Sequence, residues 1–322
     1  MFSLQLRMTL LLAALFGIIY AVVVMVGSAM GITNFYVYFF ISFFFMFLQY
    51  MIGPKMVEWS MHVRYVKRED YPRLYDMVED LARRAHIPMP KIAVSDVAIP
   101  NAFAFGRSQS DGRVCVTEGI MNLLNEEELK AVLGHELTHI RNWDVLTITL
   151  LSVIPMLLYR LAWDMLFYGN YRRARDDRNS NNTAVIGLIA FLFYFITNLL
   201  VLYASRIREY YADKGSVELG NRPSALASAL YKLVYGSARM DKDSLKEVEG
   251  FKAFFANDPS LARTEIKELS QLDLDKNGTL DAAEISLLKT REISLNFNDR
   301  LLELLGTHPN MLKRIKHLSE LG

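Results

Sequence analysis

The sequence predicts a mainly α-helical integral membrane protein with a small β-sheet. Three observations predict this fold class. The chain has 322 residues and is 52% hydrophobic, a little above the usual soluble range, and the excess is gathered in four long apolar blocks. Short strand-like segments lie between the second and third blocks, and an amphipathic helical pattern runs up to the third. We therefore expect two membrane hairpins and a soluble domain built from two parts of the chain.

The first two blocks, at about residues 8–32 and 35–52, predict a transmembrane hairpin over residues 1–53. At ~1.5 Å per residue, the first block exceeds the ~30 Å hydrocarbon thickness of a bilayer. A signal peptide would be shorter and would not be followed at once by a second apolar block. Gly27 and Gly31 lie between the blocks and favour a tight turn.

Basic residues follow the second block, whereas the turn inside the hairpin carries no charge. Lys55, Arg64 and Lys67 are among these basic residues. The positive-inside rule therefore predicts a multi-pass protein of the cytoplasmic (inner) membrane, with the region after Gly53 in the cytoplasm. Residues 54–144 are predicted to form the first part of the soluble domain.

The third and fourth blocks, Val145–Phe167 and Thr183–Ala204, predict a second membrane hairpin over residues 145–204. Arg160 and Asp164 make the third block a poorer span, and they would face other helices or water rather than lipid. The loop between these blocks holds four arginines, which the charge rule disfavours outside. Either the orientation set by the first hairpin dominates, which we favour, or the second hairpin enters the membrane only partly. In both cases residues 205–322 return to complete the soluble domain.

Local patterns predict the elements of the soluble part. Tyr71–His86 has helical periodicity. Three short strands are predicted at 91–97, 100–105 and 114–117. Asn125 is placed to cap the next helix, with Glu128 completing a capping box.

Composition excludes some classes of function. The formal net charge of +1 offers no electrostatic basis for nucleic-acid binding. The single cysteine, Cys115, allows no internal disulfide, so a reducing, cytosol-facing domain is the simpler interpretation. Its place in a predicted strand indicates a small buried side chain rather than a catalytic thiol.

The capped helix carries the motif HExxH, with histidines at 135 and 139. Residues four apart lie on one face of a helix, so His135 and His139 can hold the same metal ion. Glu136 then projects beside that metal, where it can take a proton from a bound water. Gly134 allows another part of the chain to approach closely. The spacing therefore indicates zinc-dependent peptide hydrolysis.

A catalytic zinc takes three protein ligands and leaves one position to water. Glu209, just after the fourth block, is the candidate for the third ligand. Asp213 lies one turn further along the same helical face, where it could accept the free ring N–H of a ligating histidine. On that segment alone, a solvated carboxylate at the membrane edge is the simpler interpretation of Glu209.

Taken together, these motifs resemble the HtpX-type membrane zinc metalloproteases, relatives of the CAAX prenyl proteases. The resemblance covers most of the chain. It includes His135-Glu-Leu-Thr-His139-Ile-Arg-Asn-Trp-Asp144, Ser205-Arg-x-x-Glu-Tyr-x-Ala-Asp213, the Pro100–Ala104 segment and Thr307-His308-Pro309.

The resemblance implies a gluzincin-type α+β catalytic domain with two transmembrane hairpins. It implies that zinc is bound by His135, His139 and Glu209, and that Glu136 is the catalytic base. It also implies that a strand edge beside the cleft, formed by Asn101, Ala102 and Phe103, takes up membrane-protein or peptide substrates. Free N–H and C=O groups on such an edge can pair with an extended substrate backbone.

Hydrolysis develops an oxyanion that needs a second hydrogen-bond donor. Our candidates are Arg206 and His308. A membrane-edge anchor is the alternative role for Arg206, and a turn residue before Pro309 is the alternative role for His308.

A second ion site is predicted in the segment 273–284, which fits an EF-hand loop at every diagnostic position. The predicted Ca²⁺ ligands are Asp273, Asp275, Asn277, Thr279, Asp281 and Glu284. Gly278 supplies the sharp turn and Leu280 the buried hydrophobe. The resemblance does not require this loop, so an insertion that modulates activity through calcium is our hypothesis. A solvated acidic turn is the alternative.

Three functions compete. The leading one is a zinc endopeptidase of the membrane that carries out quality control of membrane proteins. The second is a processing protease for specific or lipidated peptides. The third is a non-catalytic, calcium-responsive membrane scaffold, which would have no need of Glu136. The sequence does not decide the oligomeric state.

Overall fold

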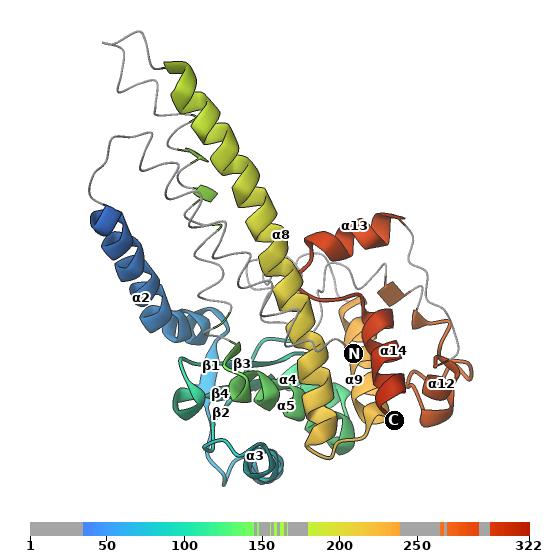
Figure 1. Ribbon diagram of the computed structural model, residues 1–322. Coiled ribbons are helices and arrows are strands. Elements are labelled where there is room, and N and C mark those ends of the chain that lie inside the picture. Colours follow the sequence, from blue (N-terminus) through green and yellow to red (C-terminus); the bar gives the residue numbers. More distant parts are fainter. Residues whose placement is uncertain are drawn as a thin grey trace. The chain divides into compact units, whose positions relative to one another are not determined.

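The computed structural model describes residues 35–144, 147, 155, 158–159, 162–163, 166, 180–238, 265–266, 269–289 and 297–322. The chain divides into two compact units (Figure 1). One unit is formed by Met1–Met51 with Leu146–Ser205, and the other by Ile52–Val145 with Arg206–Gly322.

Two long helices contain apolar residues of the first unit. Helix α2 (Phe35–Ser60) and helix α8 (Ser180–Glu218) both run on into residues of the second unit. Among the described residues, one segment is long and apolar enough to cross a membrane, Val185–Glu218 of α8. The predicted span at residues 8–32 and most of that at 145–167 lie outside the described residues. The two complete hairpins therefore stay a prediction.

Within the described part of the second unit, four short strands form one mixed sheet in the order β1-β2-β4-β3. They are β1 (Val63–Tyr65), β2 (Lys91–Ser95), β3 (Ala102–Phe105) and β4 (Arg113–Thr117). Strands β2 and β4 are parallel, and the other two pairings are antiparallel. The predicted small sheet is confirmed. Strand β1 was not predicted, because three residues are too few to show a periodic pattern.

Strand β3 lies at one edge of the sheet, and its register decides which backbone groups are free. The N–H of Asn101, just before β3, donates to the hydroxyl of Thr117 in β4 at 2.8 Å, and the C=O of Asn101 accepts from the Thr117 N–H at 2.9 Å. Because pairing alternates along an antiparallel strand, Phe103 also faces β4. The N–H and C=O groups of Ala102 and Ala104 therefore point to the open edge.

Helices pack against this sheet and against one another. The second unit contains α3 (Pro72–Ala85), η1 (Gln109–Asp111), α4 (Glu118–Leu123), α5 (Glu126–Arg141), α9 (Pro223–Ala238), α12 (Ala282–Leu287), α13 (Phe297–Leu305) and α14 (Met311–Leu321). The predicted helix at 71–86 is confirmed as α3. The predicted capping box at the start of α5 is also confirmed, with Asn125 and Glu128 bonded to each other's backbone N–H.

Helix α5 is buried on nearly all sides, and this packing holds the HExxH side chains in position. Val132, Leu133 and Leu137 belong to the main apolar core of the second unit. The C-terminal part of α8 packs closely against α5, and Ser216 Oγ donates to the carbonyl of Ala131 at 2.6 Å. A Cβ on Gly215 would lie 2.3 Å from the Thr138 side chain. Close approach therefore brings residues 209–216 of α8 alongside residues 131–139 of α5.

Candidate metal centre

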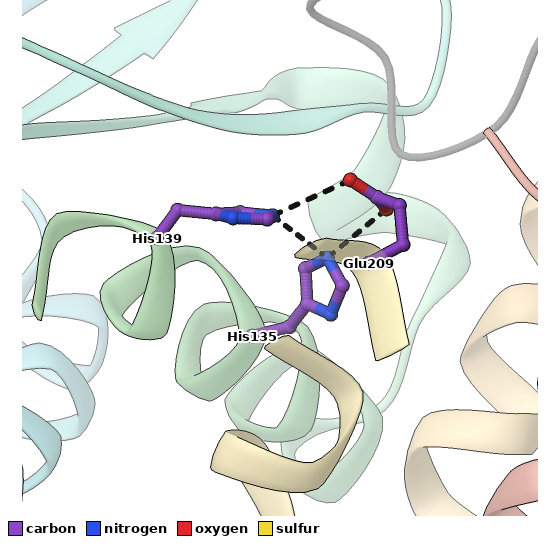
Figure 2. Close-up of side chains that lie close together, drawn as sticks. All are labelled: His135, His139 and Glu209. Atoms are coloured by element: carbon purple, nitrogen blue, oxygen red, sulfur yellow. Dashed lines mark hydrogen bonds and ion pairs between the residues drawn. The ribbon is translucent and has the colours of Figure 1, made fainter. Parts of the chain in front are cut away.

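Three side chains converge at the contact between α5 and α8, namely His135, His139 and Glu209 (Figure 2). The Nε2 atoms of the two histidines lie 3.2 Å apart. The Glu209 carboxylate oxygens lie 3.5 Å from His135 Nε2 and 3.6 Å from His139 Nε2. All three side chains are largely buried, so the cluster is built into the fold.

These separations fit a tetrahedral zinc ion. Zinc–nitrogen and zinc–oxygen bonds of ~2.0–2.2 Å at tetrahedral angles place neighbouring ligand atoms about 3.3–3.6 Å apart. Two imidazoles and one carboxylate are also a ligand set of catalytic zinc sites, in which the fourth position is left open. The arrangement of His135, His139 and Glu209 makes these residues a zinc-site candidate, as predicted.

Each candidate histidine has a carboxylate against its other ring nitrogen. Asp213 Oδ1 lies 2.9 Å from Nδ1 of His135, and Asp144 Oδ2 lies 2.6 Å from Nδ1 of His139. A carboxylate at Nδ1 fixes the tautomer and turns Nε2 toward a metal. The partner for Asp213 was predicted to be a ligating histidine. Asp144 was not predicted, although an acidic residue directly after the motif helix is a usable signal.

The backbone turn before Asp144 explains how that residue reaches back to the helix. Trp143 has φ 58°, a left-handed conformation that is uncommon for a residue with a side chain. The left-handed residue follows the C-cap Asn142 and redirects the chain after α5, so that Asp144 lies beside His139.

A fully buried arginine, Arg314 of α14, completes the cluster. Its Nη2 and Nε donate to the two carboxylate oxygens of Asp213 at 2.7 and 3.0 Å. Its Nη1 lies 3.2 Å from Oε2 of Glu209. Arg314 was not predicted. The available signal is a charge in an apolar helical stripe, because Met311, Ile315 and Leu318 are buried on the same face.

The carboxylates set the charge balance of the centre. Burial lowers the pKa of His135, but hydrogen bonding to Asp213 and Glu209 outweighs burial and raises the pKa to about 9. In the metal-free protein a proton on His135 therefore neutralises part of the acidic charge. A bound metal would displace that proton and take over the same electrostatic role.

Glu136 joins the candidate metal centre to the sheet. Its side chain is buried, and its Oε2 accepts a hydrogen bond from the backbone N–H of Ala104 at 2.8 Å. Burial is the largest influence on this carboxylate and raises its pKa. Among the predicted edge residues, Ala102 offers free backbone groups, whereas the backbones of Asn101 and Phe103 face β4.

The two predicted oxyanion donors have different surroundings. His308 is largely buried, with Nδ1 3.4 Å from Oε2 of Glu209. Arg206 instead donates from Nη1 to the carbonyls of Glu303, Leu304 and Gly306 at 2.9, 3.0 and 2.8 Å. These contacts favour a positioning role, in which Arg206 holds the end of α13 and the turn that leads to His308.

The predicted calcium loop folds as a compact turn before α12. Carboxylate oxygens of Asp273, Asp275 and Glu284 lie within 4.8 Å of one another. Asp273 accepts hydrogen bonds from the N–H groups of Asn277 and Gly278. Asp281 caps α12, and the Thr279 side chain donates to Asn277. Gly278 has φ 81°, consistent with its predicted turn role.

Comparison with known proteins gives the family. A model of peptidase family M48 matches residues 68–322. The chain is 51% identical over 232 residues to a protease HtpX homolog of Methanothermobacter thermautotrophicus, covering 72% of this chain and 86% of the relative. It is 33% identical over 287 residues to a protease HtpX homolog of Bifidobacterium longum, covering 82% of this chain and 92% of the relative.

One solved structure shows the same fold. The crystal structure of S. mikatae Ste24p matches with a TM-score of 0.50 at 17% sequence identity. The match covers 97% of this chain, which spans 64% of the length of Ste24p. With the M48 match and the His-His-Glu cluster, this chain belongs to peptidase family M48 as an HtpX-type zinc metalloendopeptidase.

Proposed function

We propose that this chain is a membrane-embedded endopeptidase that cleaves extended protein segments on the cytoplasmic side of the membrane. The observation that carries the proposal is the hydrogen bond between Glu136 and the N–H of Ala104. It joins the residue next to the candidate zinc ligands to the open edge of β3. A substrate strand paired with that edge would therefore pass directly beside the proposed base.

The residues have separate roles in the proposed reaction. His135, His139 and Glu209 hold the metal. When bound, zinc polarises a carbonyl oxygen and lowers the pKa of a coordinated water. Glu136 takes a proton from the attacking water and passes it to the leaving amine. His308, beside Glu209, is the candidate donor to the oxyanion, and Arg206 keeps His308 in place.

Substrate binding rests on the backbone of β3. The N–H and C=O of Ala102 and the C=O of Ala104 point to the open edge, where they can pair with an added strand. Main-chain pairing of this kind tolerates many sequences. Such tolerance suits quality control of membrane proteins, which must accept varied substrates, better than processing of one peptide.

Membrane placement rests on α8. The same helix contains an apolar segment able to span a bilayer and the proposed ligand Glu209. Basic residues after the predicted first hairpin support a cytoplasmic active site. Segments that leave the membrane on that side would meet the site first.

The test of catalysis is a Glu136→Gln variant of the full chain, purified in detergent, with Glu127→Gln as the matched control on the exposed face of α5. We expect Glu136→Gln to keep its zinc and lose ~10²–10⁴-fold in casein cleavage. We expect Glu127→Gln to behave as wild type. Full activity in zinc-loaded Glu136→Gln would exclude this mechanism, and lack of cleavage by the zinc-loaded wild-type chain would favour a non-catalytic scaffold.

The proposed substrate class is tested by trapping. Glu136→Gln expressed in native membranes should retain a varied set of damaged or orphaned membrane proteins. Recovery of a single peptide or of lipidated peptides alone would favour the processing protease instead.

A modulating role for calcium at residues 273–284 also belongs to the proposal. It is supported by the EF-hand ligand pattern and by Tyr231 of α9, which donates to Asp273 at 3.1 Å and ties the loop to a helix that packs on α5. Calorimetric titration of the full chain with Ca²⁺ should show binding that Asp275→Asn weakens and Glu320→Gln does not. Absence of binding in the wild-type chain would exclude the role.

A further inference from the structure

Helix α13 presents apolar side chains to the outside of the protein. Four leucines in its nine residues are exposed by 42–51%, namely Leu301, Leu302, Leu304 and Leu305. At 3.6 residues per turn they occupy one continuous arc of about 160°. Exposed apolar patches of this kind mark sites that contact a protein or a membrane.

Glu303, on the opposite side of α13, faces the protein. Glu303 pairs with Lys313 of α14 and accepts a hydrogen bond from the N–H of Asn310 at 3.4 Å. A surface helix in water normally buries its apolar stripe and exposes its charges. Helix α13 instead exposes its four leucines, together with Arg300, and turns Glu303 inward. This arrangement is favourable at an apolar surface with a polar border, where a long basic side chain can reach water.

Contacts at its C-terminal end fix where α13 lies. The buried guanidinium of Arg206 donates to the carbonyls of Glu303, Leu304 and Gly306. Arg206 is also the first charged residue after the uncharged stretch 184–205 of α8. A bilayer that takes up that stretch therefore has its surface near the level of Arg206, where basic residues commonly lie.

We propose that α13 is an interfacial membrane helix, with its four leucines inserted among the lipids at the cytoplasmic surface of the bilayer. The inference rests on the membrane placement proposed above. It also links the bilayer to catalysis, because Gly306 and Thr307 connect α13 directly to His308, 3.4 Å from Glu209. The lipid surface would thus help to hold this side of the active site in place.

The experiment uses the full chain reconstituted in phosphatidylethanolamine–phosphatidylglycerol vesicles. Leu302→Cys and Leu305→Cys, each made singly in a Cys115→Ser background, carry an environment-sensitive fluorophore. Spin-labelled lipids with shallow nitroxides report contact with the interface, and lipids with deep nitroxides report the membrane interior. Leu287→Cys is the control, because Leu287 is an exposed leucine on α12. Leu192→Cys, at an exposed position of α8, reports the membrane span itself.

We expect blue-shifted emission at 302, 305 and 192, with strong quenching by shallow nitroxides at 302 and 305 and by deep nitroxides at 192. We expect little of either effect at 287. Quenching at 192 but not at 302 and 305 would overturn the interfacial role and leave the span intact. Cross-linking of 305 between copies without lipid quenching would overturn it in favour of a second chain as the occupant. No quenching at 192 would instead overturn the membrane placement on which the inference rests.

Discussion

Arg314 donates hydrogen bonds to Asp213 from two guanidinium nitrogens, and neither side chain has any exposure to solvent. Asp213 in turn lies against His135, so α14, near the end of the chain, reaches the metal centre through one carboxylate. The pair orients a proposed zinc ligand from a part of the sequence about 180 residues away from it.

Arg314→Met should therefore unfold more readily and bind zinc more weakly. It leaves Asp213 buried without its cation, which costs about 3–5 kcal/mol. Arg314→Lys keeps the charge but not the two-nitrogen geometry, so we expect an intermediate effect. Thermal unfolding measures the stability of each variant, and zinc content measures its metal binding. Arg222→Met is the control, because its pair with Glu127 is exposed and worth ~0–1 kcal/mol. If Arg314→Met and Arg222→Met changed stability and zinc binding equally, Arg314 would have no special role in the metal centre.

Asp144→Asn should weaken zinc binding about 10–100-fold, because His139 loses the carboxylate that fixes its tautomer. Competition with a zinc-binding dye measures the affinity. Asp96→Asn serves as the control, since Asp96 belongs to an exposed surface pair with Arg64. If zinc affinity stays at the wild-type value in Asp144→Asn, the contact with His139 has no role in metal binding.

Gly215→Ala should disturb the contact between α5 and α8. The added methyl would lie 2.3 Å from Thr138, and overpacking of this kind costs about 1–3 kcal/mol. Gly53→Ala in α2 is the matched control, because a Cβ there meets nothing within 4 Å. We expect a lower thermal midpoint and weaker zinc binding for Gly215→Ala only. A wild-type midpoint would show that the two helices can separate without consequence.

Ala104→Pro should impair catalysis while the sheet survives. Its N–H faces the open edge, so proline removes no bond within the sheet, but Glu136 loses its donor. We expect kcat for casein to fall, with zinc retained. Ala102→Pro removes a free edge N–H instead, and we expect it mainly to raise KM. If the two variants changed kcat and KM alike, Glu136 would not depend on Ala104 for its orientation.

Local features of the fold could be predicted from the sequence. The capping box at Asn125 and Glu128 and the facing of His135 and His139 depend on spacing within one helix. Cys115 in β4 is fully buried, as its apolar neighbours predicted. In each case the residues that decide the structure are close together in the chain.

Contacts between distant segments could not be predicted in the same way. Arg314 reaches Asp213 only because α14 packs on the helices around the centre, which no periodicity reveals. The contacts of Arg206 with α13 depend equally on tertiary structure. Glu209 is an intermediate case, because the residues alone left it open and the family resemblance selected it as a ligand candidate.

The central claim is that His135, His139 and Glu209 hold a zinc ion in this chain. X-ray absorption spectroscopy of the zinc-loaded full chain tests it most directly, with Glu209→Gln measured beside it. We predict four nitrogen or oxygen neighbours at ~2.0–2.2 Å, scattering from two imidazole rings, and a changed or lost signal in Glu209→Gln. A sulfur neighbour at ~2.3 Å, or a spectrum unchanged by Glu209→Gln, would contradict the claim.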